Sequence, residues 1–491
     1  MSMNRTHLTS LLALAVATAA VAQDTRPVAF TNARLVTVSG PVIERGTIVV
    51  KNGKIDAIGA EVVTPAGARI VDATGMTIMP GLVSASSRAG LQPQQGPRDE
   101  GRQGGRRGGN RIEIPTGPPS GGGAQNRAAT KVVDSLYAKQ NVFGDLLRLG
   151  ITSLALNPSG SAFPGLGASL RPDGKTLEQL TIDDDAFVQI GMARDQQTKK
   201  VLKENFEKAQ KVVAARKKPP EKPAAPTETK PTDAKPADAP KTEQPKPEPK
   251  PEPKPEPKPE PKPEPKPEPK PEPKPEPKPE PKPEPKADAK TGQPAPAAAA
   301  KPEAKDPNIE VLADLLEGKR RAIVQIDSAA DMLHWQQAVA DNIEFPRTLV
   351  TRHDTQAGTI DLALEQVKAM KCAILLPPDL TTLPRSRHLI HPARILHDAG
   401  IEIGFVLGDS PATVRLLFFR LMELVRTGLP ADVALRGVTL VPAKSLGIES
   451  TVGSLETGKV ANLLVFRGDP LSPTGQLEAV WLDGREVPKQ P

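Results

Sequence analysis

The sequence predicts an α/β protein in which parallel strands alternate with helices, with β-rich segments at both ends of the chain. The alternation runs from about residue 80 to residue 440, where short aliphatic runs are separated by amphipathic stretches of helical length. Strands that alternate with helices in this way are typical of a parallel sheet covered by helices. At both ends of the chain, turn signals separate short β-rich runs instead, and two low-complexity inserts interrupt the pattern.

Residues 1–22 have the composition of a secretory signal peptide. Arg5 supplies the basic start, an apolar run covers residues 8–21, and the Ala20-Val21-Ala22 sequence is a cleavage signal. We expect cleavage after about Ala22 and a periplasmic or extracellular protein. No later segment approaches the ~20 consecutive apolar residues that span a bilayer, so the mature chain is not expected to cross a membrane.

Residues 23–79 are predicted to form the N-terminal half of a β-rich domain. The run at residues 47–50 leads into Asn52-Gly53, and residues 55–58 form the return strand. Asn-Gly between alternating apolar residues is the strongest short hairpin signal. Residues 441–491 have the same character, with a turn at residues 453–459 before a strand at residues 461–466.

The first insert, residues 92–129, lies inside the first α/β segment, residues 80–213. It combines many glycines with a cluster of arginines, Arg98, Arg102, Arg106, Arg107 and Arg111. This composition cannot bury a core, so we expect disorder. RNA binding is the alternative, but the export signal and the 3% aromatic content argue against a nucleic-acid partner.

The second insert, residues 214–306, is dominated by a Pro-Lys-Pro-Glu repeat at residues 245–286. This repeat holds 21 of the 56 prolines, which excludes a helix. It predicts a polyproline II tract with a contour of roughly 130 Å at ~3.1 Å per residue. The tract resembles the spacer of TonB-type envelope proteins in composition. A surface-loop repeat without a partner and an envelope scaffold both remain open.

The alternating elements fall in order between the inserts and the C-terminal β segment, and the second α/β segment covers residues 307–440. Strands are predicted at residues 82–84, 152–156, 322–326, 348–351, 373–376 and 403–407. Helices are predicted at residues 309–316, 330–340, 360–370 and 412–427. Cys372, the only cysteine, precedes a strand and is expected to be a packed, inert thiol.

Two motifs carry a resemblance to the amidohydrolase family, in particular to its imidazolonepropionase-like members. Residues 72–82, from Asp-Ala-Thr-Gly to Met-Pro-Gly-Leu, look like the opening of such a chain, and residues 453–463 look like its closing segment. A glycine-rich stretch between residues 157 and 176 is similar to one of that subgroup. The resemblance implies a (β/α)8 TIM-like barrel plus a composite β-sandwich built from both chain ends.

The resemblance also implies where a catalytic metal would lie. Family members hold it with two histidines after strand one, a Lys or Glu near mid-barrel, histidines after strands five and six, and an aspartate after strand eight that also acts as base. Here Ser86 and Arg88 occupy the first two positions, and Gln325 or Asp327 the strand-five position. The remaining metal-ligand candidates are His353 and Asp409, with Asp409 the candidate base. The mid-barrel position cannot be assigned.

These replacements predict a catalytically degenerate protein that binds a ligand or an active paralogue, since zinc sites need three or four ligands. Arg88 would repel a metal, and we hypothesise that its guanidinium instead neutralises Asp409 or Asp327. No cofactor is expected, but zinc or another divalent metal would be present if the site were active. His353 alternatively is a leftover core histidine, and Asp409 a helix cap.

An active hydrolase of non-peptide carbon–nitrogen bonds is the other interpretation. A homodimer is the further partner that the resemblance suggests. The net charge of +7 is spread along the chain and indicates no particular partner.

Overall fold

The computed structural model describes residues 26–91, 124–217, 305–339, 343–352, 357–383 and 385–489. The signal peptide, the repeat at residues 245–286, His353 and the arginines of the first insert from Arg98 to Arg111 lie outside these ranges. The expectations for those segments therefore stay predictions.

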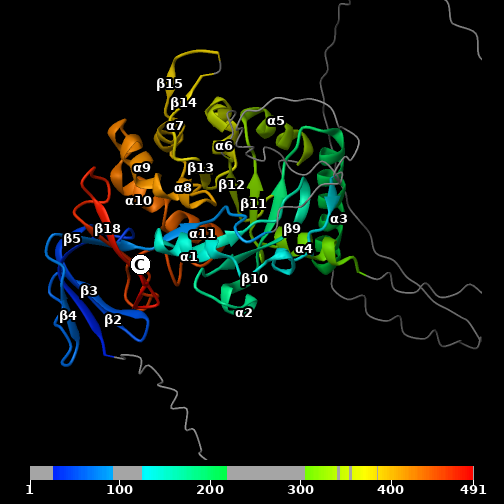
Figure 1. Ribbon diagram of the computed structural model, residues 1–491. Coiled ribbons are helices and arrows are strands. Elements are labelled where there is room, and N and C mark those ends of the chain that lie inside the picture. Colours follow the sequence, from blue (N-terminus) through cyan, green and yellow to red (C-terminus); the bar gives the residue numbers. More distant parts are fainter. Residues whose placement is uncertain are drawn as a thin grey trace, which may run out of the picture. The chain divides into compact units, whose positions relative to one another are not determined.

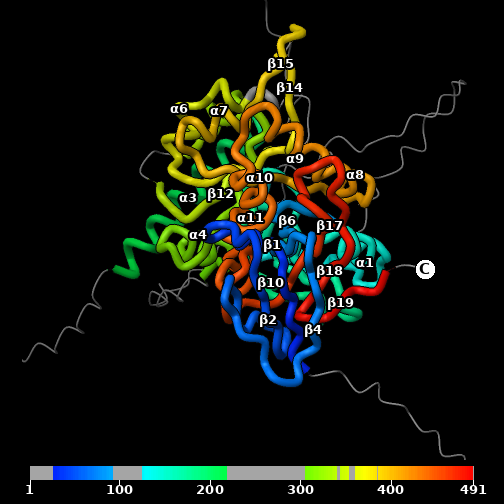
Figure 2. Tube along the Cα trace, turned by 90° about the vertical axis from the view of Figure 1, so that its left-hand side faces the viewer, coloured from blue at the N-terminus to red at the C-terminus, as the bar shows by residue number. Residues whose placement is uncertain are grey.

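Strands from the two ends of the chain form one eight-stranded sheet (Figure 1). The N-terminal part supplies β1 (Val28–Leu35), β2 (Ile43–Lys51), β3 (Lys54–Gly59), β4 (Arg69–Asp72) and β5 (Met76–Pro80). The C-terminal part supplies β17 (Leu463–Arg467), β18 (Gln476–Leu482) and β19 (Arg485–Glu486). The order is β19-β18-β17-β5-β1-β2-β3, with β4 paired to β1. Figure 2 shows the red C-terminal strands beside the blue N-terminal ones.

Two tight turns set the register of this composite sheet. Asn52 and Gly53 connect β2 to β3 with φ values of 51° and 78°. Asp483 and Gly484 connect β18 to β19 with φ values of 47° and 70°. Two successive residues with positive φ define the type I′ turn, whose twist matches that of paired strands. The predicted hairpin at Asn52-Gly53 is confirmed.

The two chain ends are held together by an apolar cluster on this sheet. The rings of Phe30 and Trp481 meet edge to face, with centroids 5.0 Å apart. Leu463 pairs with Pro80 in the antiparallel β17–β5 ladder, and both are buried. The predicted pairing of the two ends is therefore present. In the described residues the strands form one hydrogen-bonded composite sheet, and its folding into a sandwich stays a prediction.

The second sheet has the strand order of a barrel, β6-β8-β9-β10-β11-β12-β13-β16, and short β7 (Gln125–Asn126) pairs with β9. Its strands are β6 (Leu82–Ser84), β8 (Ile151–Leu156), β9 (Ala162–Leu170), β10 (Thr181–Gly191), β11 (Ala322–Gln325), β12 (Arg347–Val350), β13 (Ile374–Leu376) and β16 (Ile403–Phe405). A TIM-barrel-like α/β arrangement is thus confirmed in outline, with one departure. β9 runs antiparallel to β8 and β10, because no helix intervenes between β8 and β9 to reverse the chain.

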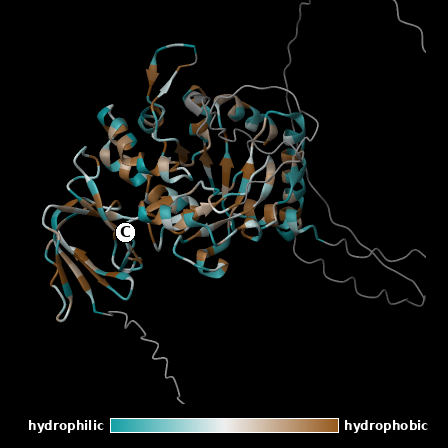
Figure 3. Cartoon of the chain, in the orientation of Figure 1, coloured by the Kyte–Doolittle hydropathy of each residue, from teal (hydrophilic) through white to brown (hydrophobic). Residues whose placement is uncertain are grey.

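Helices cover the outside of this sheet, whose strands are largely apolar, whereas the helices carry both apolar and polar residues (Figure 3). Leu146, Leu312 and Trp335 are among the helix residues buried in the core. They are α1 (Asn141–Arg148), α2 (Leu177–Leu180), α3 (Gln196–Lys217), α4 (Pro307–Leu316), α5 (Ala329–Ala338), α6 (Leu364–Ala369), α7 (Pro392–Asp398), α8 (Pro411–Arg415), α9 (Leu417–Arg426), α10 (Ala431–Gly437) and α11 (Leu440–Leu446). Two 3-10 turns, η1 (Val132–Ser135) and η2 (Ala357–Ala363), and a hairpin of β14 (Thr381–Thr382) and β15 (Leu389–Ile390) complete the described elements. None of the helices in the described ranges is long and apolar enough to cross a membrane.

The interior of the sheet is filled by side chains rather than left open. Val83, Phe187, Ile323 and Leu375 belong to one buried cluster to which α11 and the turn after it also contribute. The main-chain N–H of Val83 donates to the carbonyl of Val438 at 3.0 Å, so the segment before α11 bridges the gap between β16 and β6.

Both inserts are shorter than the sequence predicts. Residues 124–129 belong to the fold, because β7 pairs with β9 and Ala128 is fully buried. Residues 214–217 form the last turn of α3, whose Arg216 pairs with acids on α4. Composition alone places both boundaries wrongly, since each of these short segments is ordered by a contact distant in sequence.

Candidate binding site at the carboxyl ends of the strands

The loop after β6 and the loop after β16 meet at the carboxyl end of the barrel-like sheet. The main-chain N–H of Arg88 donates to Oδ2 of Asp409 at 3.1 Å. The guanidinium of Arg88 extends to the loop after β8, where Nη2 donates to Oγ of Ser159 at 3.1 Å. Three loops are thereby joined at the end of the sheet where barrel enzymes place their chemistry. We call this region the mouth.

Asp409 is not the cap of the helix that follows it. Oγ of Ser410 accepts the N–H of Thr413 at 3.2 Å and so caps α8. The residue Asp409 as a whole is exposed to solvent at the mouth. Protein atoms nevertheless surround its carboxylate, and the loss of hydrating water raises the pKa of this group. Hydrogen bonds from Ser87 and from the main chain of Arg88, and the charge of Arg88, offset part of that rise. The alternative interpretation, that Asp409 caps α8, is therefore wrong.

Three buried polar residues, Ser87, Asn157 and Gln189, form a chain of hydrogen bonds next to the contact between Arg88 and Asp409. The N–H of Ser87 donates to Oδ1 of Asn157 at 2.8 Å, and the N–H of Asn157 donates back to the carbonyl of Ser87 at 2.8 Å. Nδ2 of Asn157 then donates to Oε1 of Gln189 at 3.0 Å. All three residues are less than a tenth exposed. Because buried polar groups are costly without partners, this reciprocal pairing holds the loop after β6 in one position.

At the position after strand five, Asp327 forms an ion pair with Arg352. Gln325 ends β11, and its Nε2 donates to both oxygens of Asp327 at 3.2 Å. Asp327 also accepts the N–H of Arg352 at 3.2 Å and its Nε at 3.1 Å. β11 and β12 are adjacent and parallel, so the residues that follow them come together directly.

This pairing corrects half of the hypothesis about Arg88. Asp327 is neutralised by Arg352, because Arg352 follows the strand next to it, whereas Arg88 follows β6 at the other end of the sheet order. Arg88 contacts Asp409 through its main chain, and its guanidinium lies on Ser159. Ser86 is partly buried in the same loop, and its carbonyl accepts the hydroxyl of Ser84 at 3.3 Å.

The described side chains of the mouth do not fit a zinc or similar divalent centre. Arg88 brings a fixed positive charge, Asp327 already binds a guanidinium, and Asp409 accepts two hydrogen bonds. His353, the other ligand candidate, lies outside the described residues. Across the described ranges, three carboxylates within 4.8 Å of one another occur elsewhere, at Asp183, Asp184 and Asp185.

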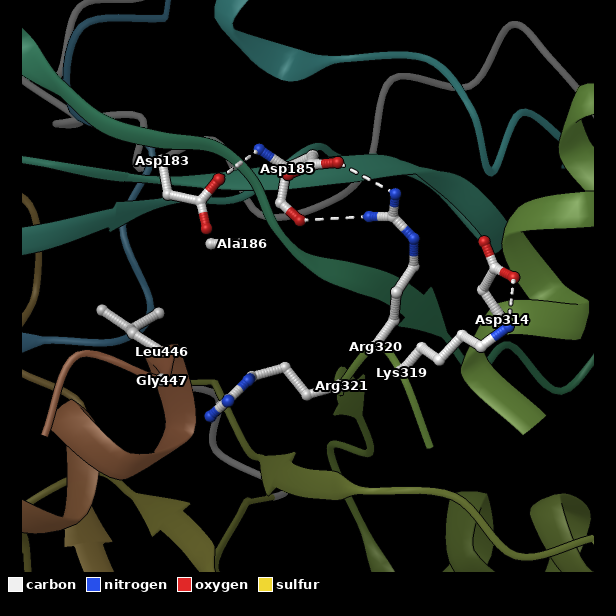
Figure 4. Close-up of a pocket in the computed structure, with 9 residues that line it drawn as sticks. All are labelled: Asp183, Asp185, Ala186, Asp314, Lys319, Arg320, Arg321, Leu446 and Gly447. Carbon is white, nitrogen blue, oxygen red and sulfur yellow. Dashed lines mark hydrogen bonds and ion pairs between the residues drawn. The ribbon is translucent and has the colours of Figure 1, made fainter. Parts of the chain in front are cut away.

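Asp183 and Asp185 of this group line a cavity of about 360 Å³ (Figure 4). The cavity lies at the amino ends of β10 and β11, the end of the sheet opposite the mouth. Asp185 pairs with Arg320 at 2.9 Å, and Asp184 pairs with Lys131 at 2.6 Å. Burial, with the neighbouring carboxylate of Asp185, raises the pKa of Asp183.

Arg321, across the cavity, donates to the carbonyl of Lys444 at 2.7 Å and so caps the last turn of α11. The charged groups here serve mainly as structural partners. Polar residues at this end of a barrel are typical of stability rather than chemistry.

The sequence analysis does not identify Asn157, Gln189 or Arg352 as site residues. Asn157 directly follows the fully buried strand β8, and a polar residue at the carboxyl end of such a strand is a usable signal. Gln189 interrupts the apolar run of β10. Neither signal shows which residues face each other, since that depends on the closure of the sheet.

The family model described as "Amidohydrolase family" matches residues 325–487. An imidazolonepropionase of Pseudomonas paraeruginosa is 31% identical over 161 residues, which is 32% of this chain and 35% of that protein. An imidazolonepropionase of Yersinia enterocolitica is 30% identical over 149 residues, 30% of this chain and 32% of that protein. The match spans about a third of the length of these curated relatives.

The fold is similar to that of a solved amidohydrolase from Thermotoga maritima. The TM-score is 0.62 at 19% sequence identity, and the alignment covers 94% of this chain and all of the other. This similarity extends the likeness of architecture well beyond the C-terminal third, to both sheets.

Proposed function

We propose that this chain, which belongs to the amidohydrolase family, is a catalytically degenerate member whose mouth binds a small molecule without a catalytic metal. The observation that carries this proposal is the position of Arg88. It stands where the family resemblance implies a histidine ligand, and its main-chain N–H donates to Asp409, the candidate base.

The charge of Arg88 supports the proposal energetically. A guanidinium does not deprotonate in proteins. At ~4 Å and an effective dielectric constant of ~20, it repels a unit positive charge by roughly 4 kcal/mol, and a dication by about twice that. A complete structural zinc site binds with an apparent ~10–16 kcal/mol, so one such arginine would offset much of the affinity.

The hydrogen bonds among Ser87, Asn157 and Gln189 are a second observation that supports the proposal. Gln189 lies on β10, in the middle of the strand order. Its carboxamide is neutral and is bound to Asn157. Ser87, Asn157 and Gln189 together supply hydrogen bonds that stabilise the loop after β6, a role that metal ligation would otherwise perform.

Elemental analysis of the purified mature protein tests the proposal. We expect zinc, iron and manganese well below one atom per chain, also after growth with added metal. Stoichiometric metal that survives dialysis would overturn it. Metal bound equally by an Arg467→Gln variant and lost from an Asp409→Asn variant would assign that metal to the mouth.

An active hydrolase of a cyclic amide is the second candidate, and the retained Asp409 favours it. Activity on a cyclic amide substrate that disappears in Asp409→Asn would establish it. An envelope scaffold rests on the repeat at residues 245–286, which lies outside the described residues. Deleting that repeat and following retention in the envelope tests this third function.

Export remains a proposal that rests on residues 1–22. Sequencing the amino terminus of protein recovered from a periplasmic extract tests it. We expect Gln23 as the first residue. A chain that begins at Met1 or Ser2 in the cytosolic fraction would contradict export.

A further inference from the structure

We infer that the mouth binds a small organic anion with two or more carboxylate or phosphate groups, held by the guanidinium groups of Arg88 and Arg352. The inference rests on the proposed metal-free mouth and names the chemistry of its ligand. It depends on three observations: where these arginines lie, what holds them, and how their exposure compares with that of their partners.

Arginines follow three strands that run in the same direction. Arg88 follows β6, Arg194 follows β10 and Arg352 follows β12, and the carboxyl ends of these strands all point to the mouth. A barrel-like sheet places such residues around one opening. The three arginines therefore lie at the same end of the sheet, the end at which the family places its reacting atoms.

Arg352 and Arg194 each pair with an acid whose side chain is more buried than that of the arginine. The side chain of Arg352 is 50% exposed, whereas that of its partner Asp327 is 16% exposed. The side chain of Arg194 is 48% exposed over Asp331, which is 7% exposed. In both pairs the acid lies deeper and orients the guanidinium, whose positive charge is the part that solvent reaches.

Arg88 is held differently. Its guanidinium is bound by the neutral hydroxyl of Ser159, and the side chain is exposed. Asp409, the acid nearest in the same loop contact, accepts the hydroxyl of Ser87 and the main-chain N–H of Arg88. The charge of Arg88 is thus oriented toward the mouth by a partner that does not neutralise it.

Guanidinium chemistry points to carboxylate or phosphate as the complementary group. A guanidinium has a planar fork of five N–H donors that matches the paired oxygens of these anions. Nε and Nη2 of Arg352 already donate to Asp327, so a ligand adds to an existing ion pair there, whereas Arg88 is bound by a neutral hydroxyl. Anchoring beneath the fork reduces the rotamer freedom lost on binding, which favours affinity. Because Arg88 and Arg352 lie on separate loops, a ligand with two anionic groups fits better than one with a single group.

Isothermal titration calorimetry of the full mature chain tests the inference, with citrate and inorganic phosphate as probes and glycerol as the neutral probe. We expect saturable binding of citrate that weakens as sodium chloride is raised, weaker binding of phosphate, and none of glycerol. Arg88→Gln should weaken citrate binding about 10-fold or more, since a charge-assisted hydrogen bond is lost.

Removing Arg352 alone would leave Asp327 buried without its partner. The pair is therefore removed together in an Arg352→Gln/Asp327→Asn variant, which should also lose about 10-fold in affinity. Arg467→Gln is the matched control. Its side chain is 64% exposed over Glu478 on the composite sheet, and citrate affinity should be unchanged. Thermal melts identify variants that bind less because they unfold.

Three outcomes would overturn the inference. In the first, the wild-type chain shows no saturable binding of either anion. In the second, the Arg88 and Arg352 variants bind citrate as tightly as wild type, and in the third, Arg467→Gln weakens citrate binding as much as they do. These failures differ from failure of the proposed function. A metal-free protein that binds no anion overturns only the ligand class. Anion binding abolished by a chelator and restored by zinc would overturn the metal-free mouth itself.

Discussion

The main-chain N–H of Arg88 donates a 3.1 Å hydrogen bond to the carboxylate of Asp409, a residue 321 positions later in the chain. The contact joins the first and the last strand of the barrel-like sheet at the mouth. It also means that the side chain of Arg88 is directed elsewhere, to Ser159. The candidate base Asp409 and Arg88, which stands where the resemblance implies a histidine, therefore share a loop contact.

Replacing Asp409 by Asn should change how stability depends on pH. Burial raises the pKa of Asp409 in the folded state above its unfolded value. Protonated Asp409 therefore favours folding below its unfolded pKa, and this contribution is lost as pH rises through the folded pKa. An Asn side chain can still accept the N–H of Arg88 but does not ionise. Thermal melts should show the variant gaining stability relative to wild type from pH 3 to pH 7. A difference that does not vary with pH would contradict the raised pKa.

Replacing Asn157 by Ala should destabilise the fold. The substitution leaves the buried N–H of Ser87 and the buried Oε1 of Gln189 without their partner. An unsatisfied buried polar group costs roughly 1–3 kcal/mol, which urea unfolding measures.

The matched control for Asn157 is Gln179→Ala. Gln179 is exposed, and its Oε1 accepts the N–H of Lys175 at 3.0 Å. This variant should stay within about 0.5 kcal/mol of wild type. Equal effects of the two substitutions would show that the buried chain has no special role.

Replacing Arg216 by Gln should loosen the contact between α3 and α4. Arg216 pairs with Glu310, Asp314 and Glu317, at 2.8 Å for the last two. Isolated exposed pairs contribute about 0–1 kcal/mol, and networks of charges contribute more. We expect a loss of about 1 kcal/mol that shrinks in 1 M sodium chloride, where the Debye length falls to ~3 Å. Lys200→Gln, which breaks one exposed pair with Glu204 at 3.8 Å, should have almost no effect. A loss that high salt does not reduce would point to packing instead.

The thiol of Cys372 should react slowly in the folded protein. Burial raises its pKa from the ordinary 9.0 to about 11, and the thiolate is the reactive form. At pH 8 this rise of two units lowers the thiolate fraction about 100-fold. Alkylation by iodoacetamide, followed by mass spectrometry, should be correspondingly slower than in protein unfolded with urea. Equal rates in the two states would contradict burial of the thiol.

The sequence predicts the strands well where apolar runs are short and bounded by turns. The predicted strands at residues 322–326 and 373–376 lie within one or two residues of β11 and β13. The pattern does not predict β9 or its antiparallel direction, because a run of alternating small and apolar residues carries no sign of strand orientation. The β-rich ends are likewise recognisable, but their single shared sheet is a matter of tertiary pairing.

The residue identities at the mouth follow from the sequence by itself. Ser86 and Arg88 stand at positions where the resemblance implies histidines, and no folding changes the fixed charge of a guanidinium. The tertiary structure determines which side chain each arginine contacts. Arg352 lies against Asp327 because their strands are neighbours in the sheet, and Ser159 receives Arg88 because β8 adjoins β6. Residue type determines charge and hydrogen-bonding capacity, whereas partners depend on which strands become adjacent, and local sequence does not encode that adjacency.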